Sequence, residues 1–251
     1  MNEEQITKHK IIDIANRSYK QNIYTFSNFL SITELSILYS MKKELSFISF
    51  DTFGGYDGCE RAMVRFGSEE LFGYTEDFPI TVIKISPLIE KFSEELGHRD
   101  YLGALMNLGI KRELLGDIII NNKTAYVLCV EHIANYITDN LNTIKHTHVQ
   151  CELSNLPQDS QAKKLEDIEI ISASPRIDAV VAAITHLSRS QALNYFTSKK
   201  IYVNNLCMEN NSYQLKCDDI LVIRGYGKYI YKGFNKETRK GRVYIQLQHY
   251  T

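Results

Sequence analysis

The sequence lacks long apolar segments and paired cysteines. No stretch approaches the roughly 20 consecutive apolar residues of a membrane-spanning helix, and the first ten residues carry two glutamates and two lysines instead of the apolar core of a secretion signal. The five cysteines are odd in number and form no C-x-x-C pair, which argues against a disulfide framework and a thiolate zinc site. We therefore expect a protein of the reducing cytoplasm with no membrane partner.

The chain also lacks a strong net charge, but its charges are unevenly distributed. A composition of 44% hydrophobic and 24% charged residues, with a formal net charge of -1, excludes a disordered or fibrous chain and fits one to three globular domains. Residues 172–251 carry 12 basic and 5 acidic side chains, a balance of +7, whereas the remainder sums to -8. A basic terminal module is typical of nucleic-acid binding, although a solvated lysine-rich face has the same composition.

The elements predict an α+β protein with three parts and one linker. The first part, 1–76, is predicted to be a mostly helical α/β segment, in which Ser31 and Glu34 have the spacing of a capping box. Two predicted strands, 46–53 and 61–66, flank the glycine-rich turn 54–58. The other predicted parts are a middle domain over 77–153, a linker over 154–170 with a short strand at 168–171, and a final domain over 171–251.

The middle domain has the element order of a ferredoxin-like βαββαβ sandwich. This topology often binds RNA, but the run of aromatic residues found in an RRM is missing, and Tyr126 is the only aromatic residue on the third strand. The topology alone therefore does not identify a ligand. The predicted strands are 80–85, 117–121, 124–130 and 147–152, and the predicted helices are 100–108 and 131–141.

Two helix starts in the final domain predict a phosphate site. The Ser-Pro pair at 174–175, with Asp178 in the first turn, is typical of a helix N-terminus. Ser188 and Gln191 form the capping box of a second helix. Arg189 lies in that first turn, where a cation is unfavourable unless an anion binds beside it. Because helix N-termini bind phosphate and arginine adds a bidentate fork, these side chains predict a phosphate clamp.

Further cations follow in the same domain. Lys199 and Lys200 come after the second helix and directly before a predicted strand, 201–204. Arg224 and Lys228 follow another strand, beside the aromatic pair of Tyr226 and Tyr229. Each of these cations taken singly fits a solvated surface charge. Their clustering within one short unit favours an RNA contact.

The order of short motifs in the last third of the chain resembles an S4 RNA-binding domain. These motifs are Arg176-Ile177-Asp178, Leu187 to Ala192, Ile201 to Asn204, Asp219-Ile220 and Arg224-Gly225. Longer upstream runs resemble the YlmH family of bacterial S4-domain proteins, so the resemblance spans nearly the whole chain. These runs are Gly54-Gly55-Tyr56 with Glu60-Arg61, His98 to Leu105, Gly109 to Arg112, and Gly116-Asp117.

This resemblance implies a cytoplasmic, ribosome-associated RNA-binding protein of the translation apparatus, without catalytic chemistry. The implied partners are the large ribosomal subunit, its rRNA and peptidyl-tRNA, with a role in the rescue of stalled nascent chains. No cofactor, metal or small-molecule substrate is expected, and the chain is expected to be a monomer. The implied RNA-facing residues are Arg176, Ser188, Arg189, Gln191, Lys199, Lys200 and Asn204, with Arg224 and Lys228 beside them.

The middle domain offers a second RNA contact. Its candidate residues bracket one predicted helix and are His98, Arg99, Lys111 and Arg112. The alternative is that Arg99 forms a local ion pair with Asp100 at the helix start.

Three turns depart from the S4 pattern. The family has glycine just before the strand at Ile201, where this chain has Ser198-Lys199, and also at Asn205 and Asp218. Asn and Asp tolerate positive φ better than other non-glycine residues, so we expect those two turns to survive. The sequence does not predict the backbone conformation of the turn at 198–199.

Enzyme patterns are incomplete. Arg176-Ile177-Asp178 is similar to the aspartate motif of pseudouridine synthases, but only about 70 residues follow it, too few for that catalytic domain. A dinucleotide site requires its glycines to precede a helix, and no helix is predicted after Gly225-Tyr226-Gly227. The kinase-like run at 98–100 lacks the metal-binding Asn of a kinase catalytic loop. His146 and His148 lack a third metal ligand nearby. An RNA-modifying enzyme with an S4 targeting domain, and a scaffold whose acidic N-terminal segment recruits a protein, remain as alternatives.

Overall fold

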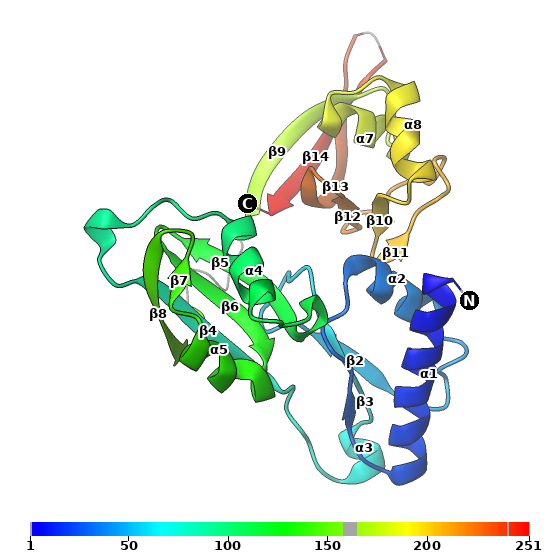
Figure 1. Ribbon diagram of the computed structural model, residues 1–251. Coiled ribbons are helices and arrows are strands. Elements are labelled where there is room, and N and C mark those ends of the chain that lie inside the picture. The colour runs from blue at the N-terminus through cyan, green and yellow to red at the C-terminus, as the bar shows by residue number, and fades with distance from the viewer. Residues whose placement is uncertain (1, 158–164, 240, 251) are drawn as a thin grey trace. The chain divides into compact units, whose positions relative to one another are not determined.

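The computed structural model describes residues 2–157, 165–239 and 241–250, and it confirms the predicted α+β class. The chain forms two compact units (Figure 1). The first contains Met1–Glu34 and Met41–Ala162, and the second contains Leu35–Ser40 and Lys163–Thr251. None of the helices in the described ranges combines the length and apolarity needed to cross a bilayer.

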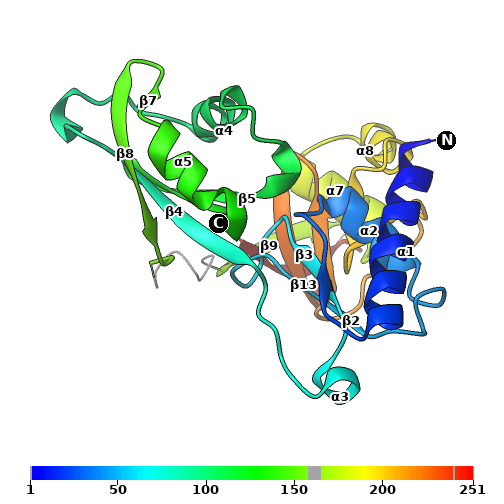
Figure 2. The same cartoon turned by 60° about the horizontal axis from the view of Figure 1, so that its bottom comes forward.

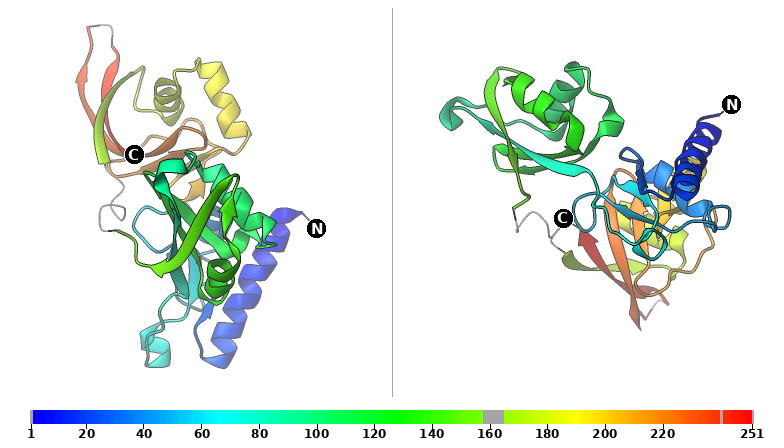
Figure 3. Two further views of the ribbon diagram at one scale, coloured as in Figure 1. Left: turned by 60° about the vertical axis from the view of Figure 1, so that its left-hand side comes forward. Right: turned by 90° about the horizontal axis from the view of Figure 1, so that it is seen from below.

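The N-terminal segment combines helices with a small antiparallel sheet. Helix α1 begins with a capping box between Asn2 and Gln5, and it ends where Asn22 adopts a left-handed conformation. The predicted box ahead of the second helix is confirmed, because the Ser31 amide donates to Glu34 Oε2 at 2.7 Å. Helix α1 lies against the sheet, whose strand order is β1-β3-β2 (Figure 3). The elements are α1 (Glu3–Gln21), β1 (Thr25–Phe26), α2 (Ile32–Ser40), β2 (Phe50–Phe53), β3 (Met63–Phe66) and α3 (Glu69–Phe72).

The middle segment has the predicted βαββαβ order. Its sheet has the antiparallel order β5-β6-β4-β8-β7, which is the ferredoxin-like order with the short strand β7 added at one edge. Helices α4 and α5 cover one face (Figure 2), where Ile83, Leu105 and Ile137 are fully buried. The elements are β4 (Ile80–Pro87), α4 (His98–Asn107), β5 (Leu115–Asn121), β6 (Thr124–Val130), α5 (Ala134–Asn140), β7 (Thr143–Ile144), β8 (Thr147–Ser154), and the 3-10 helices η1 (Glu90–Phe92), η2 (Arg112–Leu114) and η3 (Glu131–Ile133).

A buried carboxylate joins the N-terminal segment to the middle sheet. Asp117 on β5 accepts hydrogen bonds from the Tyr56 hydroxyl at 2.7 Å, the Glu60 amide at 2.7 Å and the Arg61 amide at 3.1 Å. Arg61 in turn donates to the carbonyl oxygens of Leu115 at 3.1 Å and Phe29 at 2.6 Å. Burial and the neighbouring Asp117 raise the pKa of Tyr56 well above its usual value. The glycine-rich loop therefore closes onto β5 and does not serve only as a turn between strands.

Two glycines allow this close approach. Gly55 has a φ of +101°, and a Cβ there would lie 2.0 Å from Leu128 Cδ2. A Cβ on Gly116 would lie 2.7 Å from Phe29 Cε1. The first two predicted segments therefore share one apolar core, formed by Phe29, Tyr56, Met63, Leu128, Val130 and Leu156.

The second unit places two helices against a six-stranded sheet with the order β11-β10-β12-β13-β14-β9. Its core gathers Ile177, Val180 and Val181 from the first helix and Phe196 from the second. The β13–β14 hairpin projects beyond the rest of its sheet (Figure 3). The elements are β9 (Leu165–Ser172), α7 (Ile177–Thr185), α8 (Arg189–Thr197), β10 (Ile201–Val203), β11 (Leu206–Cys207), β12 (Ile220–Ile223), β13 (Gly227–Glu237) and β14 (Val243–Tyr250).

The region predicted as a linker is partly a strand. Residues 158–164 lie outside the described residues, but β9 begins at Leu165 and pairs with β14 over its whole length. Ile168 and Ile170 pack against the core of the second unit, which explains why the strand extends beyond the predicted short segment. Residues 165–170 therefore belong to the sheet.

The turns that lack the family's glycines keep a glycine-like backbone. Asn205 has a φ of 65° and Asp218 a φ of 67°, as expected for residues that tolerate this region. Lys199 also has a positive φ, 53°, so the turn before β10 is formed by a lysine in a conformation that costs about 1–2 kcal/mol. The chain thus places a cation where backbone conformation favours glycine.

We predict that Asp117→Ala lowers the free energy of unfolding of the first unit by about 3 kcal/mol, because the buried Tyr56 hydroxyl and two partly buried amides lose their acceptor. Urea titration followed by circular dichroism measures this change. Asp139→Ala, which removes an exposed carboxylate on α5 that has no partner among the described residues, serves as the control. Equal stabilities for the two variants would contradict the role given to Asp117.

Candidate nucleic-acid interface

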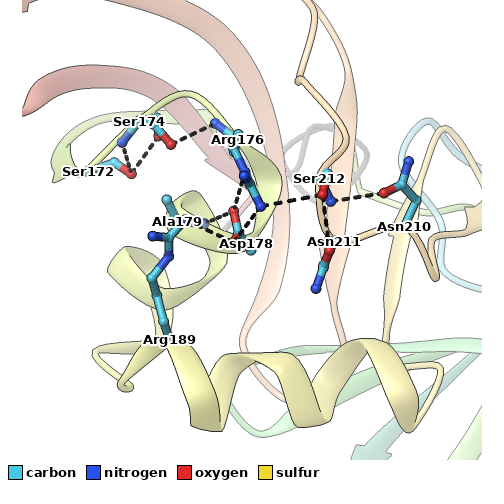
Figure 4. A network of polar contacts seen from close by, with 9 residues as sticks. All are labelled: Ser172, Ser174, Arg176, Asp178, Ala179, Arg189, Asn210, Asn211 and Ser212. Carbon is cyan, nitrogen blue, oxygen red and sulfur yellow. Dashed lines mark hydrogen bonds and ion pairs between the residues drawn. The ribbon is translucent and has the colours of Figure 1, made fainter.

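One buried carboxylate holds two of the predicted RNA-facing arginines (Figure 4). Arg176 donates through Nε and a terminal nitrogen to Asp178 at 3.2 and 3.1 Å, and Arg189 donates to the same carboxylate at 3.0 Å. The Asp178 side chain is only 8% exposed, whereas those of Arg176 and Arg189 are 38% and 54% exposed. The carboxylate is therefore buried, and the guanidinium groups lie at the surface.

This arrangement corrects one step of the sequence argument. The unfavourable position of Arg189 at the start of α8 was expected to require a bound phosphate. The structure supplies the Asp178 carboxylate as an internal anion, so Arg189 is stabilised without a ligand. Asp178 also accepts a hydrogen bond from the Ala179 amide at 2.9 Å, which fixes the carboxylate at the start of α7.

Ser188 and Gln191 form the predicted capping box. The Ser188 amide donates to Gln191 Oε1 at 3.0 Å, and the Gln191 amide donates to Ser188 Oγ at 3.3 Å. Both side chains are exposed and hold the first turn of α8 in place. They therefore shape the helix start beside Arg189.

The other end of α8 carries the predicted lysines and an aromatic pair. Lys200 Nζ lies 5.3 Å from the ring centre of Tyr195, and the rings of Tyr195 and Tyr226 meet edge to face with centroids 5.8 Å apart. The Arg224 amide donates to the Lys200 carbonyl at 3.0 Å, so Arg224 neighbours Lys200. Lys199 pairs with Glu209 at 3.3 Å through exposed side chains.

One sequence-based expectation in this region, the pairing of Tyr226 with Tyr229, needs correction. Tyr226 pairs with Tyr195, whereas Tyr229 is buried and stacks on His249 with ring centroids 4.6 Å apart. Asn204 uses both ends of its amide inside the fold, because Nδ2 donates to Asp219 Oδ1 at 2.8 Å and Oδ1 accepts from the Ile220 amide at 2.9 Å. The contacts of Asn204 shape a turn with positive φ.

The structure thus arranges the predicted cations at both ends of one helix. Because α8 has nine residues, its ends lie roughly 13 Å apart. We call this surface the α8 ridge; it comprises Arg176, Arg189, Lys199, Lys200 and Arg224. Lys228 lies on the adjacent strand β13, with Nζ 4.9 Å from the ring centre of Tyr250. Sequence reasoning missed Tyr195, because its contact with Lys200 forms only where the chain turns back after the end of α8.

The four candidate residues of the middle segment separate into two groups. His98 and Arg99 are exposed at the start of α4, and Lys111 is exposed at the start of η2. Arg112 is different, because it donates to the carbonyl oxygens of Leu115 at 2.6 Å and Gly116 at 3.0 Å. Burial and the neighbouring Arg61 lower the pKa of Arg112 to about 10. Arg112 therefore stabilises the joint with the N-terminal segment.

The alternative ion pair between Arg99 and Asp100 is not formed. Asp100 instead accepts the Gly97 amide at 2.9 Å, as a helix cap, and pairs with Lys145 at 2.7 Å. The Lys145 ammonium and the Gly97 amide hold the pKa of Asp100 below its usual value. Within the described ranges no three His, Cys, Asp or Glu side chains come together as a metal site, and His148 lies 3.1 Å from the Thr143 hydroxyl.

Comparison with known proteins shows what this chain is similar to. Residues 74–158 match the family model described as "Putative RNA-binding domain in YlmH". A protein of Bacillus subtilis (strain 168) named "Ribosome-associated protein quality control protein P2" is 27% identical over 198 residues, which cover 78% of this chain and 76% of that protein. These matches confirm the resemblance to the bacterial YlmH family that the sequence motifs predicted.

A solved structure supports the fold. The structure described as "Cell division protein ylmH from Streptococcus pneumoniae" aligns with a TM-score of 0.51 and 17% sequence identity. The alignment covers 61% of this chain and 92% of that chain. At this identity the match shows a shared fold alone.

We predict that Asp178→Ala lowers the free energy of unfolding of the second unit by about 2 kcal/mol, because two guanidinium groups and one amide lose their acceptor. Glu209→Ala removes an exposed pair in the same unit and should change stability by at most about 0.5 kcal/mol. Urea titration compares the two variants. If Asp178→Ala proved as mild as Glu209→Ala, the carboxylate would not organise the helix starts.

Proposed function

We propose that this protein is a non-catalytic RNA-binding factor that associates with the ribosome and binds structured rRNA or tRNA on the large subunit through the α8 ridge. The observation that carries the proposal is the arrangement of five cations at the two ends of one helix, two of them fixed by a buried carboxylate. The description of the matched family model and the name of the Bacillus subtilis relative support it.

The fixed arginines favour binding because less side-chain freedom is lost when RNA arrives. Ordering a long side chain at an interface costs about 0.5–1.5 kcal/mol. Arg176 and Arg189 are already ordered by Asp178. Arg189 uses one terminal nitrogen for that contact, and its remaining N–H groups suit a phosphate oxygen.

The far end of the ridge suits an unpaired base. Tyr226 is exposed and forms an edge-to-face pair with Tyr195, on which Lys200 rests. Aromatic side chains stack on bases exposed by loops and bulges of folded RNA. Arginine contacts at one end and an aromatic pair at the other fit structured RNA with a bulged or looped nucleotide.

The net positive charge of residues 172–251 adds a long-range electrostatic attraction to RNA. Their balance of +7 attracts the phosphate backbone without regard to sequence and speeds encounter with RNA. Ribosomal RNA and bound tRNA present dense phosphate surfaces of this kind. By analogy with the name of the Bacillus subtilis relative, the proposed role is quality control of stalled nascent chains, with peptidyl-tRNA as a further partner and a monomer as the acting form.

We predict that Arg189→Ala weakens binding to the large ribosomal subunit about tenfold and reduces the slope of log affinity against log salt by about 0.7–0.9, because one phosphate contact is lost. Co-sedimentation with purified subunits over a salt series measures both quantities. Arg176 still pairs with Asp178 in this variant, so the fold is kept.

Lys216→Ala is the matched control, because Lys216 is an exposed cation of the same unit outside the ridge. Its effect should be limited to a weak change in affinity. Binding of Arg189→Ala that equals the control, or binding that does not depend on salt, would refute the ridge as the interface.

We further predict opposite effects of Lys199→Gly on stability and binding. Glycine relieves the left-handed strain and should keep or raise stability by up to about 1 kcal/mol. RNA affinity should fall severalfold, because the cation is removed. Urea titration and co-sedimentation on the same preparation test this pair of changes. A loss of stability, or unchanged affinity, would contradict it.

A further inference from the structure

The helical side of the middle segment contains an open cleft. Its volume is about 450 Å³, and its walls come from α4, from the end of α5 and from the chain between α5 and β8. The volume falls within the range of small-ligand sites. The charged and polar residues that line it are Arg99, Asp100, Asn107, Asn140, Asn142, Thr143 and Lys145, so the two cations outnumber the one carboxylate.

One of its cations is held in a strained turn. Lys145 connects β7 to β8 with a φ of 53°, a region that costs a non-glycine residue about 1–2 kcal/mol. Its ammonium pairs with Asp100 Oδ1 at 2.7 Å, and the Gly97 amide donates to the other carboxylate oxygen, Oδ2, at 2.9 Å. Because strained conformations gather at binding sites, Lys145 marks this cleft as more than a packing gap.

The second cation and two of the amides are open to a ligand. Arg99 is exposed on the first turn of α4 and has no ion-pair partner among the described residues. The side-chain amides of Asn107 and Asn142 make no hydrogen bond within the described part of the chain. The cleft therefore offers a guanidinium together with amide donors and acceptors.

An exposed aromatic ring stands beside the cleft. The Tyr136 hydroxyl donates to the carbonyl of Leu108, a lining residue, at 3.1 Å, while 48% of Tyr136 stays exposed. Asn140 donates to the Tyr136 carbonyl at 2.8 Å, which leaves its own oxygen as an acceptor. Cations, amides and an adjoining ring are the groups that proteins use to hold an unpaired nucleotide.

We propose that this cleft binds one nucleotide of single-stranded RNA. Arg99 and Lys145 contact the phosphate, Asn107 and Asn142 hydrogen-bond to the base edge, and Tyr136 stacks on the base. The proposal rests on the proposed function in taking RNA as the ligand, and it adds a second site outside the α8 ridge. Amides that both donate and accept suit a base edge better than an acidic peptide, whose carboxylates only accept. The cleft also lies within residues 74–158, which match the RNA-binding-domain model.

The test uses the full chain and two probes, labelled hexauridylate and purified large ribosomal subunits. Lys145→Gly removes the cation and also relieves the strained φ, so it should not unfold the protein. Lys145→Gly and Arg99→Ala should each weaken hexauridylate binding about tenfold, the loss expected for one charge-assisted contact. Lys91→Ala, an exposed cation of the same segment that does not line the cleft, is the control and should bind normally.

The outcomes separate the two proposals. Weakening of hexauridylate by the cleft variants, with Lys91→Ala unchanged, supports the cleft. Hexauridylate binding that only Arg189→Ala weakens overturns the cleft and leaves the α8 ridge standing. Failure of the unaltered chain to bind either probe overturns both proposals. Displacement of hexauridylate by hexaglutamate at equal concentration overturns RNA as the ligand and favours an acidic peptide.

Discussion

The buried carboxylate of Asp178 is the interaction on which the candidate interface depends. It accepts from Arg176, which precedes α7, and from Arg189, which begins α8, so one side chain aligns two helix starts. Burying a lone carboxylate is costly, and two guanidinium groups with one backbone amide compensate for that cost. Without Asp178, each arginine would be a mobile surface cation. With it, the two guanidinium groups have a fixed separation and orientation.

A second buried carboxylate, that of Asp117, has the opposite effect on its cations. It closes the loop containing Tyr56 and Arg61 onto β5, where the guanidinium groups of Arg61 and Arg112 are half-buried and donate to backbone carbonyl oxygens. In the second unit the carboxylate is inside and the arginines are at the surface. In the first unit the arginines stabilise the fold through hydrogen bonds to backbone carbonyl oxygens. The same residue types therefore have different roles, which depend on how much solvent reaches the guanidinium group.

Local features of the structure could be predicted from the sequence because their causes are local. The capping boxes at Ser31 and Ser188, and the order of helices and strands along the middle segment, follow from spacings of a few residues. The left-handed turns at Asn205 and Asp218 followed from the steric tolerance of those side chains.

Features that depend on distant partners could not be predicted. The extension of β9 depends on β14, more than 70 residues away in the sequence. Arg112 was expected at the surface, but carbonyl oxygens of the following strand hold its side chain half-buried. At Asp178 the sequence revealed an electrostatic conflict for Arg189 but not that the resolving anion is the protein's own side chain. Charge patterns identify which groups need a partner, and only the tertiary structure shows which partner they find.

The shared core of the first unit has a consequence for how its ferredoxin-like sheet can be used. Sheets of this topology in RRM proteins display aromatic residues on the open face and stack bases there. Here Leu128 and Val130 on that face are covered by Phe29, Tyr56 and Met63 of the N-terminal segment. The centre of the usual base platform is thus occupied by the chain's own side chains. A nucleotide site in this domain therefore has to lie on the opposite side of the sheet, where the helices and their loops are exposed to solvent.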